Sequence, residues 1–308
     1  MPAPVPTLPP ALSGRCETFA SDAGTLCCYC AGPPDSGNRP ILLIHSINAA
    51  ASACEVRPLF DHYRMTRPVY AIDLPGYGGS ERSDRFYSPR LMTDAVLAMT
   101  ERIAALHGGS AIDAIAVSLS SEYLARAAHE HPSLYRAVVL VSATGLNRSR
   151  PFYGPPGSMR GKAWLLALLG RAPWSPLLFA GLTRRGVIRF FLAKTWGSKD
   201  IDEGLLEYDM ITTRQPGAAY APFHFLSAFL FSADISRIYE QITLPVLLVH
   251  GTRGDFVRYP DADRLARIAR WDVVVMQTGA LPYFEDIAGF AAACDAFVQR
   301  RWDSPEAV

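Results

Sequence analysis

Short runs of aliphatic residues recur along the chain, with helical stretches between them. The runs are Ile41 to Ile44, Val69 to Ile72, Ile112 to Ala116, Ala137 to Val141, Pro245 to Val249 and Val273 to Met276. Because they are apolar throughout and do not alternate with polar residues, they predict strands that are buried on both faces. Their alternation with helices predicts an α/β fold with a mostly parallel sheet of about eight strands, and Cys16 to Ala31 is expected to add an antiparallel edge hairpin.

The strand pattern stops between residues 147 and 236, where helical segments rich in Trp, Leu and Phe take its place. We therefore expect a core of residues 15–146 and 237–303 with a helical lid, residues 147–236, inserted between two strands. Residues 1–14 are rich in proline and lack the basic start and apolar centre of a secretory signal. They predict a flexible arm.

The composition limits the partners of the protein. A chain of 308 residues with 49% hydrophobic content and a net charge of +1 can bury a large core and offers no basic surface for nucleic acid. The most apolar long stretch, Trp164 to Leu182, is interrupted by Arg171, Pro173 and Pro176, so no membrane span is expected. A cytoplasmic protein is expected, and a homodimer is left open.

Cys27, Cys28 and Cys30 crowd one of the strand-like segments. Neighbours on a strand point to opposite faces and pair badly with one another, so we expect reduced thiols and no metal. No cofactor is expected.

Ser118 follows the third apolar run and precedes a helical stretch. A sharp strand-to-helix turn there would expose its hydroxyl at the top of the sheet; the usual sequence for that turn is G-x-S-x-G, because the strained backbone needs small neighbours. Here the sequence is Ala116-Val117-Ser118-Leu119-Ser120, which keeps small residues but neither glycine. Taken alone, it favours a structural serine.

Three further motifs change that interpretation. In chain order they are His45-Ser46-Ile47-Asn48, Asp73-Leu74-Pro75-Gly76-Tyr77-Gly78-Gly79-Ser80 and His250-Gly251-Thr252-Arg253-Gly254-Asp255. They are similar to the His-Gly segment, the D-x-P-G-x-G-x-S stretch and the H-G-x-x-D pattern of the α/β-hydrolase superfamily, the last with one extra residue. From Arg15 onward the chain resembles that superfamily, which implies an α/β-hydrolase fold.

The resemblance also implies roles for single residues. Ser118 would be the nucleophile, the backbone N–H groups of Ile47 and Leu119 would form the oxyanion hole, and Asp255 would orient a histidine. A serine hydroxyl is a poor nucleophile until a base removes its proton, and an imidazole held by a carboxylate does so near neutral pH.

The expected histidine is missing. The superfamily carries G-H-x-P-x-x-E after its last strand, whereas this chain carries Gly279-Ala280-Leu281-Pro282-Tyr283-Phe284-Glu285. A methyl group transfers no proton, and losing such a histidine costs on the order of a millionfold in turnover. We expect a gap the size of an imidazole beside Ala280, filled by water, a ligand or a neighbouring side chain. We expect Asp255 to find water, an arginine such as Arg253, or a raised pKa.

Two origins of Ala280 stay open. An isolated change from His to Ala in an intact motif suggests engineering. Ser46, Ala116 and Ser120 also replace glycines of the superfamily, however, and this favours a divergent natural branch.

Other residues are candidates for a replacement base or for the lining of a substrate pocket. His45 and His250 end strands near the site but match structural positions of the superfamily, and His224 either reaches over Ser118 or packs among lid aromatics. Tyr283 is a poor base because an ordinary phenol has a pKa near about 10. The apolar lid residues either bury the lid on the sheet or form a hydrophobic pocket. The residues expected to line that pocket are His45, Asn48, Phe223, His224 and Tyr283.

The sequence predicts a serine hydrolase of the esterase class acting on an ester, a thioester or a carbon–carbon bond beside a carbonyl in a hydrophobic small molecule. A binding protein that keeps the pocket is one alternative. An acyltransferase or lyase that uses Ser118 without the usual base is the other.

Overall fold

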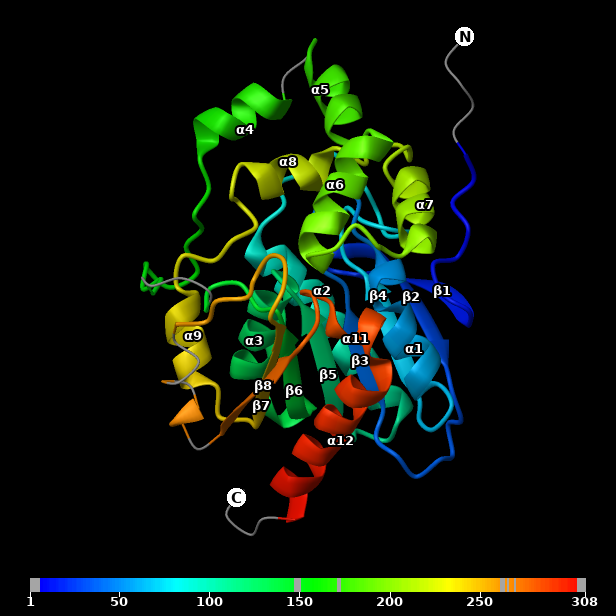
Figure 1. The fold of residues 1–308 in the computed structure, drawn as a ribbon, viewed down its shortest axis with the longest axis vertical. Coiled ribbons are helices and arrows are strands. Elements are labelled where there is room, and N and C mark those ends of the chain that lie inside the picture. The colour runs from blue at the N-terminus through cyan, green and yellow to red at the C-terminus, as the bar shows by residue number, and fades with distance from the viewer. Residues whose placement is uncertain are drawn as a thin grey trace.

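A computed structural model describes residues 6–146, 151–170, 173–260, 264, 266–268 and 270–303. Its centre is an eight-stranded sheet with the order β1-β2-β4-β3-β5-β6-β7-β8 (Figure 1). The strands are β1 (Arg15–Ser21), β2 (Gly24–Ala31), β3 (Ile41–Ile44), β4 (Val69–Asp73), β5 (Ile112–Val117), β6 (Tyr135–Val141), β7 (Val246–Gly251) and β8 (Trp271–Met276). Strand β2 is antiparallel to β1 and β4, and the remaining pairs are parallel. The predicted sheet with its antiparallel edge hairpin is confirmed.

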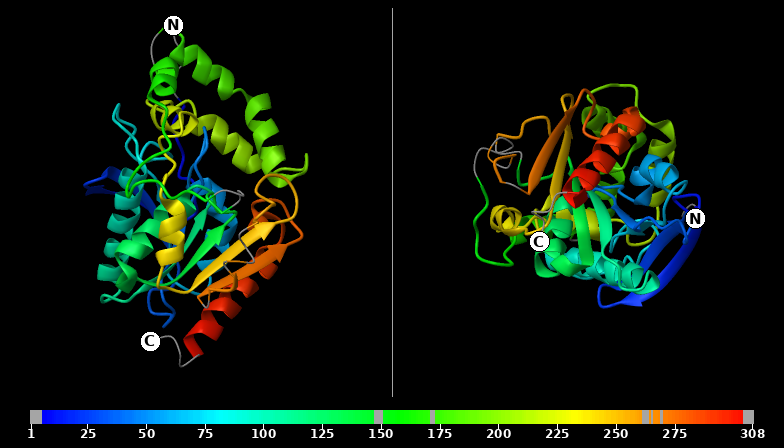
Figure 2. Two further views of the ribbon diagram at one scale, coloured as in Figure 1. Left: turned by 90° about the vertical axis from the view of Figure 1, so that its left-hand side faces the viewer. Right: turned by 90° about the horizontal axis from the view of Figure 1, so that it is seen from below.

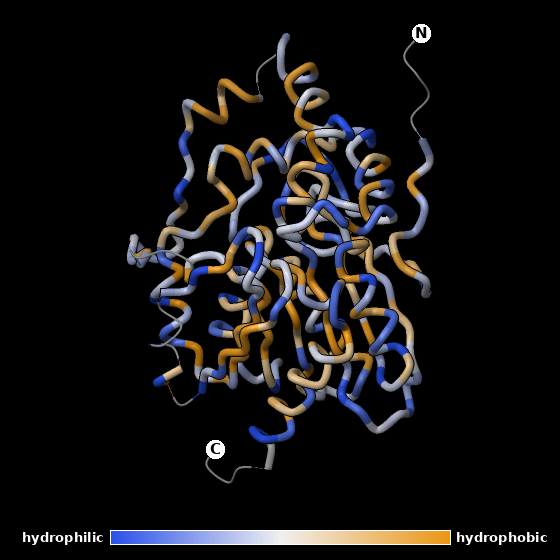
Figure 3. Tube along the Cα trace, in the orientation of Figure 1, coloured by the Kyte–Doolittle hydropathy of each residue, from blue (hydrophilic) through white to orange (hydrophobic). Residues whose placement is uncertain are grey.

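Helices cover both faces of the sheet (Figure 2). On one face lie α2 (Pro89–Leu106), α3 (Ser120–Glu130) and α9 (Ile235–Gln241); on the other lie α1 (Arg57–Tyr63), α11 (Pro282–Glu285) and α12 (Ile287–Asp303). Leu42 and Ile44 enter the first core, and Ile41 and Leu43 enter the second. Side chains alternate along a strand, so a run apolar at every position fills both cores, and the hydrophobic segments in Figure 3 follow the strands.

A set of helices between β6 and β7 lies above the carboxyl edge of the sheet (Figure 1). It comprises α4 (Ala163–Gly170), α5 (Ser175–Leu182), α6 (Arg185–Trp196), α7 (Glu203–Thr212) and α8 (Tyr220–Leu226). We call these helices the lid. Helix α9, which follows them, packs on α3 against the sheet. The boundaries predicted at 146/147 and 236/237 stay predictions, and residues 147–150 lie outside the described residues.

The two segments that connect the lid to the sheet meet at one buried carboxylate. Glu122 in α3 is fully buried and accepts hydrogen bonds from the Thr144 hydroxyl, the Arg160 guanidinium and the Ser232 backbone N–H, at 2.6, 2.6 and 2.8 Å. The Arg160 guanidinium also lies 4.0 Å from the ring centroid of Phe152. Arg160 precedes the lid helices and Ser232 follows them, so both connections are attached to α3.

The proline-rich start is held in place from residue 6 onward. The carbonyl of Pro9 accepts a hydrogen bond from the Tyr208 hydroxyl at 2.9 Å, and that of Pro6 accepts one from the Gln215 amide at 2.8 Å. Ala11 and Leu12 are buried. The expectation of a flexible arm is therefore wrong for residues 6–14, because backbone carbonyls and small apolar side chains fasten this segment to α7 and to the sheet.

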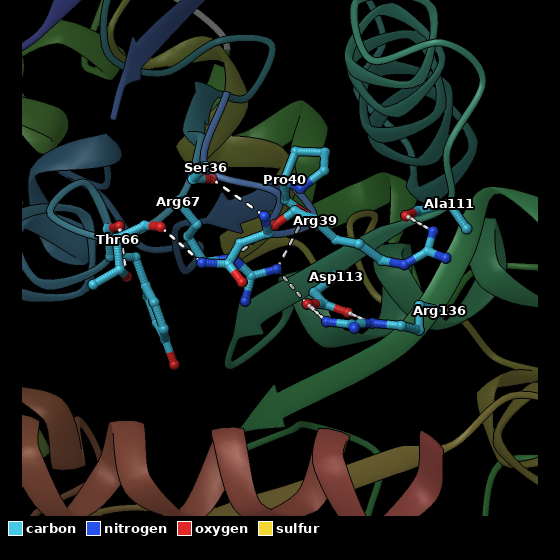
Figure 4. A network of polar contacts seen from close by, with 10 residues as sticks. Ser36, Arg39, Pro40, Thr66, Arg67, Ala111, Asp113 and Arg136 are labelled. Carbon is cyan, nitrogen blue, oxygen red and sulfur yellow. Dashed lines mark hydrogen bonds and ion pairs between the residues drawn. The ribbon is translucent and has the colours of Figure 1, made fainter. Parts of the chain in front are cut away.

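The opposite, amino edge of the sheet is closed by a buried ion cluster (Figure 4). Asp113, at the start of β5, pairs with the guanidinium groups of Arg67 and Arg136, and Arg67 also donates to the carbonyl of Arg39 at 2.7 Å. Two guanidinium groups satisfy the carboxylate, so the strand starts here without an unpaired buried charge.

Cys16, Cys27, Cys28, Cys30, Cys54 and Cys294 all carry free thiols. Burial raises the pKa of Cys28 to about 12, as expected for a thiol that acts as a small apolar side chain. No single helix among the described residues is long and apolar enough to cross a membrane; only α4 and α5, bent by 94°, would pass as a pair by length and composition.

Replacing Glu122 by alanine is expected to destabilise the fold by about 3–5 kcal/mol, because it leaves the Arg160 guanidinium buried without its carboxylate. Urea unfolding measures the change. The matched control is Glu130→Ala in the same helix, whose pair with Arg90 is exposed and is worth less than about 1 kcal/mol. Equal losses in the two variants would contradict the anchoring role of Glu122.

Candidate active site

Ser118 occupies a strained turn between β5 and α3. Its φ angle is 55°, a conformation that costs a residue other than glycine roughly 1–3 kcal/mol. The backbone N–H of Ser118 donates to the carbonyl of Val141 in β6 at 2.8 Å, and its side chain is only half-buried. Ser120, which replaces a glycine of the motif, donates its hydroxyl to the His45 carbonyl at 2.5 Å. This bond connects the turn to the end of β3, a contact that no local sequence pattern marks.

The loop after β3 is held by a buried carboxylate. Glu55, in the short helix η1 (Ala53–Val56), accepts hydrogen bonds from the Ser46 backbone N–H at 2.8 Å and from the Asn48 side-chain amide at 2.6 Å. No hydrogen bond among the described residues takes up the backbone N–H of Ile47 or of Leu119. The role of Glu55 was not predicted from the sequence, where its only signal is an acidic residue within a run of small apolar residues.

The histidines considered as replacement bases are engaged elsewhere. The Leu74 backbone N–H donates to Nε2 of His45 at 3.0 Å, so the proton of this imidazole is on Nδ1, which lies 2.6 Å from the carbonyl of Ser46. His250 stacks on Tyr259 with ring centroids 4.4 Å apart, and burial lowers its pKa.

His224 lies among the aromatic rings of Phe86, Tyr87 and Phe229, and its Nδ1 lies 2.9 Å from the carbonyl of Tyr220. Burial lowers its pKa. Of the two alternatives, packing among aromatics is the one observed. Phe223 likewise packs inside the lid, on Phe179.

Asp255 takes its partner from the lid. Its carboxylate lies 3.4 Å from Nζ of Lys194 in α6, and its backbone N–H donates to the Lys194 carbonyl at 3.1 Å. Arg253, one of the three alternatives expected for Asp255, pairs with Glu285 instead. Glu285 also accepts a hydrogen bond from the N–H of Gly279 at 2.7 Å.

The end of α6 also lies against the loop of Ala280. The N–H of Ala280 donates to the Thr195 carbonyl at 2.9 Å, and a Cβ placed on Gly279 would clash with the backbone of Trp196. A Cβ on Gly254 would lie 2.6 Å from the Lys194 carbonyl oxygen. These glycines allow the backbone of α6 to approach both loops closely.

Ala280 is 1% exposed, and its loop is covered by the C-terminal turn of α6. The imidazole-sized space expected beside Ala280, filled by water, a ligand or a neighbouring side chain, stays a prediction. The carbonyl of Ala280 accepts a hydrogen bond from the Ser142 hydroxyl at 2.6 Å.

Ser142 connects this loop with Ser118. It follows β6 directly, has a φ angle of 48°, and its N–H donates to Val249 in β7 at 2.8 Å. The structure thus links Ser118, Ala280 and the end of β7 through β6, while Phe223 and His224 lie apart from them in the lid. Ser142 has no sequence signature and was missed.

An open cavity of about 800 Å³ lies at the surface of the lid, between α5, α7 and α8. Phe179, Thr213 and Ala218 are among its lining residues, together with Arg184 and Arg214. None of the five residues expected to line the substrate pocket borders this cavity. Within the described part of the chain, no group of three or more His, Cys, Asp or Glu residues could hold a metal ion.

Comparison with known proteins identifies the family to which this fold belongs. A sequence model described as "Alpha/beta hydrolase family" matches residues 41–293. The chain belongs to the alpha/beta hydrolase family. A search of curated protein sequences found no match.

Solved structures of other hydrolases share the fold of this family member. A meta-cleavage product hydrolase from Pseudomonas fluorescens IP01 is 15% identical, with a TM-score of 0.67 over 92% of this chain and 97% of that one. The enol-lactonase from Burkholderia xenovorans LB400 is 16% identical, with a TM-score of 0.66 over 92% and 100%. A deformylase from Pseudomonas putida S16 is 19% identical, with a TM-score of 0.64 over 91% and 100%. At these identities the likeness concerns the fold alone.

Gly279→Ala is expected to destabilise this hydrolase-family protein by about 1–3 kcal/mol, because the added methyl group must displace the backbone of α6. The control is Gly186→Ala within α6, where nothing lies within 4 Å and the better helix propensity of alanine adds up to about 1 kcal/mol. Thermal unfolding of the two variants measures both changes. A Gly279→Ala protein as stable as the parent would mean that α6 does not dock on this loop.

Proposed function

We propose that the protein is a serine-type hydrolase that binds the carbonyl of an ester, a thioester or a ketone in a hydrophobic small molecule, and in which Ser118 is the nucleophile. The observation that carries the proposal is the strained turn at Ser118, together with the backbone N–H groups of Ile47 and Leu119, which have no acceptor among the described residues. Such donors stabilise the oxyanion that forms when a hydroxyl attacks a carbonyl, and removing one donor typically costs about 10²–10³ in kcat.

The chemical step is slow in this proposal because Ala280 stands at the position of the expected base. Ala280 transfers no proton, and the Asp255 carboxylate is paired with Lys194. Oxyanion stabilisation and binding alone leave about a thousandfold or more over the uncatalysed reaction. The expected activity is a low but specific turnover at Ser118.

A second candidate is a binding protein that keeps the site and has lost turnover. The close packing of α6 on the loops of Asp255 and Ala280 favours the binding protein, because α6 packs at the position where a histidine and Asp255 would transfer a proton. In this candidate, Ser118 and the free N–H groups bind a carbonyl group and no bond is broken. A cytoplasmic location and a homodimer are further proposals that rest on the sequence alone.

Ala280→His is expected to raise kcat/KM on p-nitrophenyl butyrate by at least about a hundredfold, the lower end of what a general base contributes. The rate should fall as the pH drops below about 6.5, because the protonated imidazole accepts no proton. Stopped-flow or steady-state release of p-nitrophenol measures both effects.

Two controls accompany this variant. Ala280→Gln adds a side chain without a base, and Ser118→Ala combined with Ala280→His removes the nucleophile; neither should gain activity. If Ala280→His folds and remains as slow as Ala280→Gln on a panel of short and medium esters, the hydrolase proposal fails and the binding protein replaces it.

A further inference from the structure

Helices α4 and α5 of the lid are apolar at almost every position and yet lie at the surface. Their sequences are AWLLALLG and SPLLFAGL, and Figure 3 shows both as largely hydrophobic. No residue of α4 is buried, and in α5 only Phe179 is buried. A helix that is hydrophobic on all sides normally lies in a protein core or in a membrane, so the composition of these two helices calls for a partner surface.

The outward side chains of the two helices form one surface. The large exposed ones are Trp164, Leu168, Trp174 and Leu177, and we call these four residues the apolar patch. The indole N–H of Trp174, at the start of α5, donates to the Leu168 carbonyl in α4 at 2.7 Å, so the patch is continuous from one helix to the other. The inward side chains pack with α8 in a small cluster around Phe179 and Phe223. Both helices lie at the end of the lid that is farthest from the sheet (Figure 1).

The charge of this part of the chain differs from that of the whole protein. No Asp or Glu occurs between Glu130 and Asp200, although the net charge of the chain is only +1. Two exposed cations flank the helix pair, because Lys162 directly precedes α4 and Arg184 follows α5. Neither of them forms an ion pair among the described residues. The apolar patch therefore lies between two cations that have no local counter-charge.

The cavity beside α5 extends this positive surface. Its lining includes Arg184, Arg185 and Arg214, and Asp84 is the acidic residue that lines it. Arg185 is paired with Glu207 at 2.6 Å, whereas Arg184 and Arg214 form no ion pair among the described residues. The surface around the end of α5 is thus positive on balance, and it favours an anionic partner.

A lipid surface matches these features better than a second copy of the chain. A two-fold interface would place each patch on itself and bring Lys162 and Arg184 of the two copies near one another, which like charges oppose. Trp side chains and flanking Lys or Arg are typical of helices that lie in the interface between lipid headgroups and acyl chains. Each helix has eight residues. At about 1.5 Å per residue this length cannot cross about 30 Å of hydrocarbon, but lying along the interface needs no greater length.

We propose that the apolar patch, with Lys162 and Arg184 beside it, binds the surface of an anionic lipid bilayer. The apolar side chains enter the acyl boundary, and the two cations contact the headgroups. The proposal goes beyond the proposed function, because it concerns where the protein binds and not which bond it cleaves. Since the lid lies above the carboxyl edge of the sheet, binding turns the edge that carries Ser118 toward the bilayer (Figure 1).

Vesicle co-sedimentation with the full chain tests the proposal. The two probes are vesicles of phosphatidylcholine alone and vesicles that also contain about 30% phosphatidylglycerol. Each Lys or Arg near an anionic surface strengthens binding about fivefold, so two cations predict about twentyfold stronger binding to the anionic vesicles at about 0.1 M salt. Raising the salt to about 0.5 M should remove most of this difference, because the charges are then screened.

Two variants separate the apolar from the charged contribution. Leu177→Ser removes a side chain that is 77% exposed and should weaken binding to both kinds of vesicle at least about tenfold. Its control is Leu106→Ser at an exposed position of α2, outside the lid, which should bind as the parent does.

Lys162→Gln combined with Arg184→Gln should remove the preference for anionic vesicles. Its control is Arg15→Gln combined with Arg102→Gln, which changes the net charge equally in β1 and α2 and should keep the preference. Thermal unfolding checks that all four variants fold.

Three results would overturn the proposal. One is that the parent binds neither kind of vesicle. Another is that the lid variants and their controls lose binding equally. The third comes from light scattering: if the parent is a dimer that Leu177→Ser separates into monomers, the patch binds a second copy.

These outcomes are separate from those of the hydrolase proposal, since no bond is broken in the vesicle experiments. Binding should persist in Ser118→Ala. Patch-dependent vesicle binding by a protein without esterase activity would retain the lipid surface and reject the hydrolase. Esterase activity at Ser118 without vesicle binding would do the reverse.

Discussion

Glu122 lies in the first turn of α3, the helix that follows Ser118. Its carboxylate accepts hydrogen bonds from the segment that leads into the lid and from the segment that leaves it. A buried carboxylate cannot remain without partners, so this charge fixes where both segments run. The same helix begins with the strained turn of Ser118. The segments that connect the lid and the turn of Ser118 are thus both attached to one element, α3.

The second constraint is the approach of the α6 backbone to the loops that follow β7 and β8. Gly254 and Gly279 leave no side chain between these loops and α6, and Lys194 pairs with the carboxylate that would otherwise orient a histidine. An exposed ion pair of this kind contributes little by itself. Its effect is geometric. The loop that carries Asp255, the loop that carries Ala280 and the end of α6 pack together at the position that a proton relay would occupy.

Much of the fold could be predicted from the sequence, because strands buried on both faces must be apolar at every position, as in Ile41 to Ile44. The turn at Ser118 was also predictable, since its flanking residues are small. The contacts that complete the site were not: Glu55, Ser142 and Lys194 act through tertiary contacts, and no local pattern marks an acid, a serine or a lysine for such a role. The proline-rich start misled for the same reason, since its carbonyls bind partners about 200 residues away, as the separation of 199 between Pro9 and Tyr208 shows.

The strained turn at Ser118 is costly for folding alone. Its left-handed backbone is unfavourable by roughly 1–3 kcal/mol. A glycine at this position would relieve the cost, because glycine adopts a positive φ angle without that penalty. Residues held in such conformations cluster at active sites and ligand clamps, where the surrounding structure maintains them. The strained backbone therefore supports the proposal that Ser118 acts on a bound ligand.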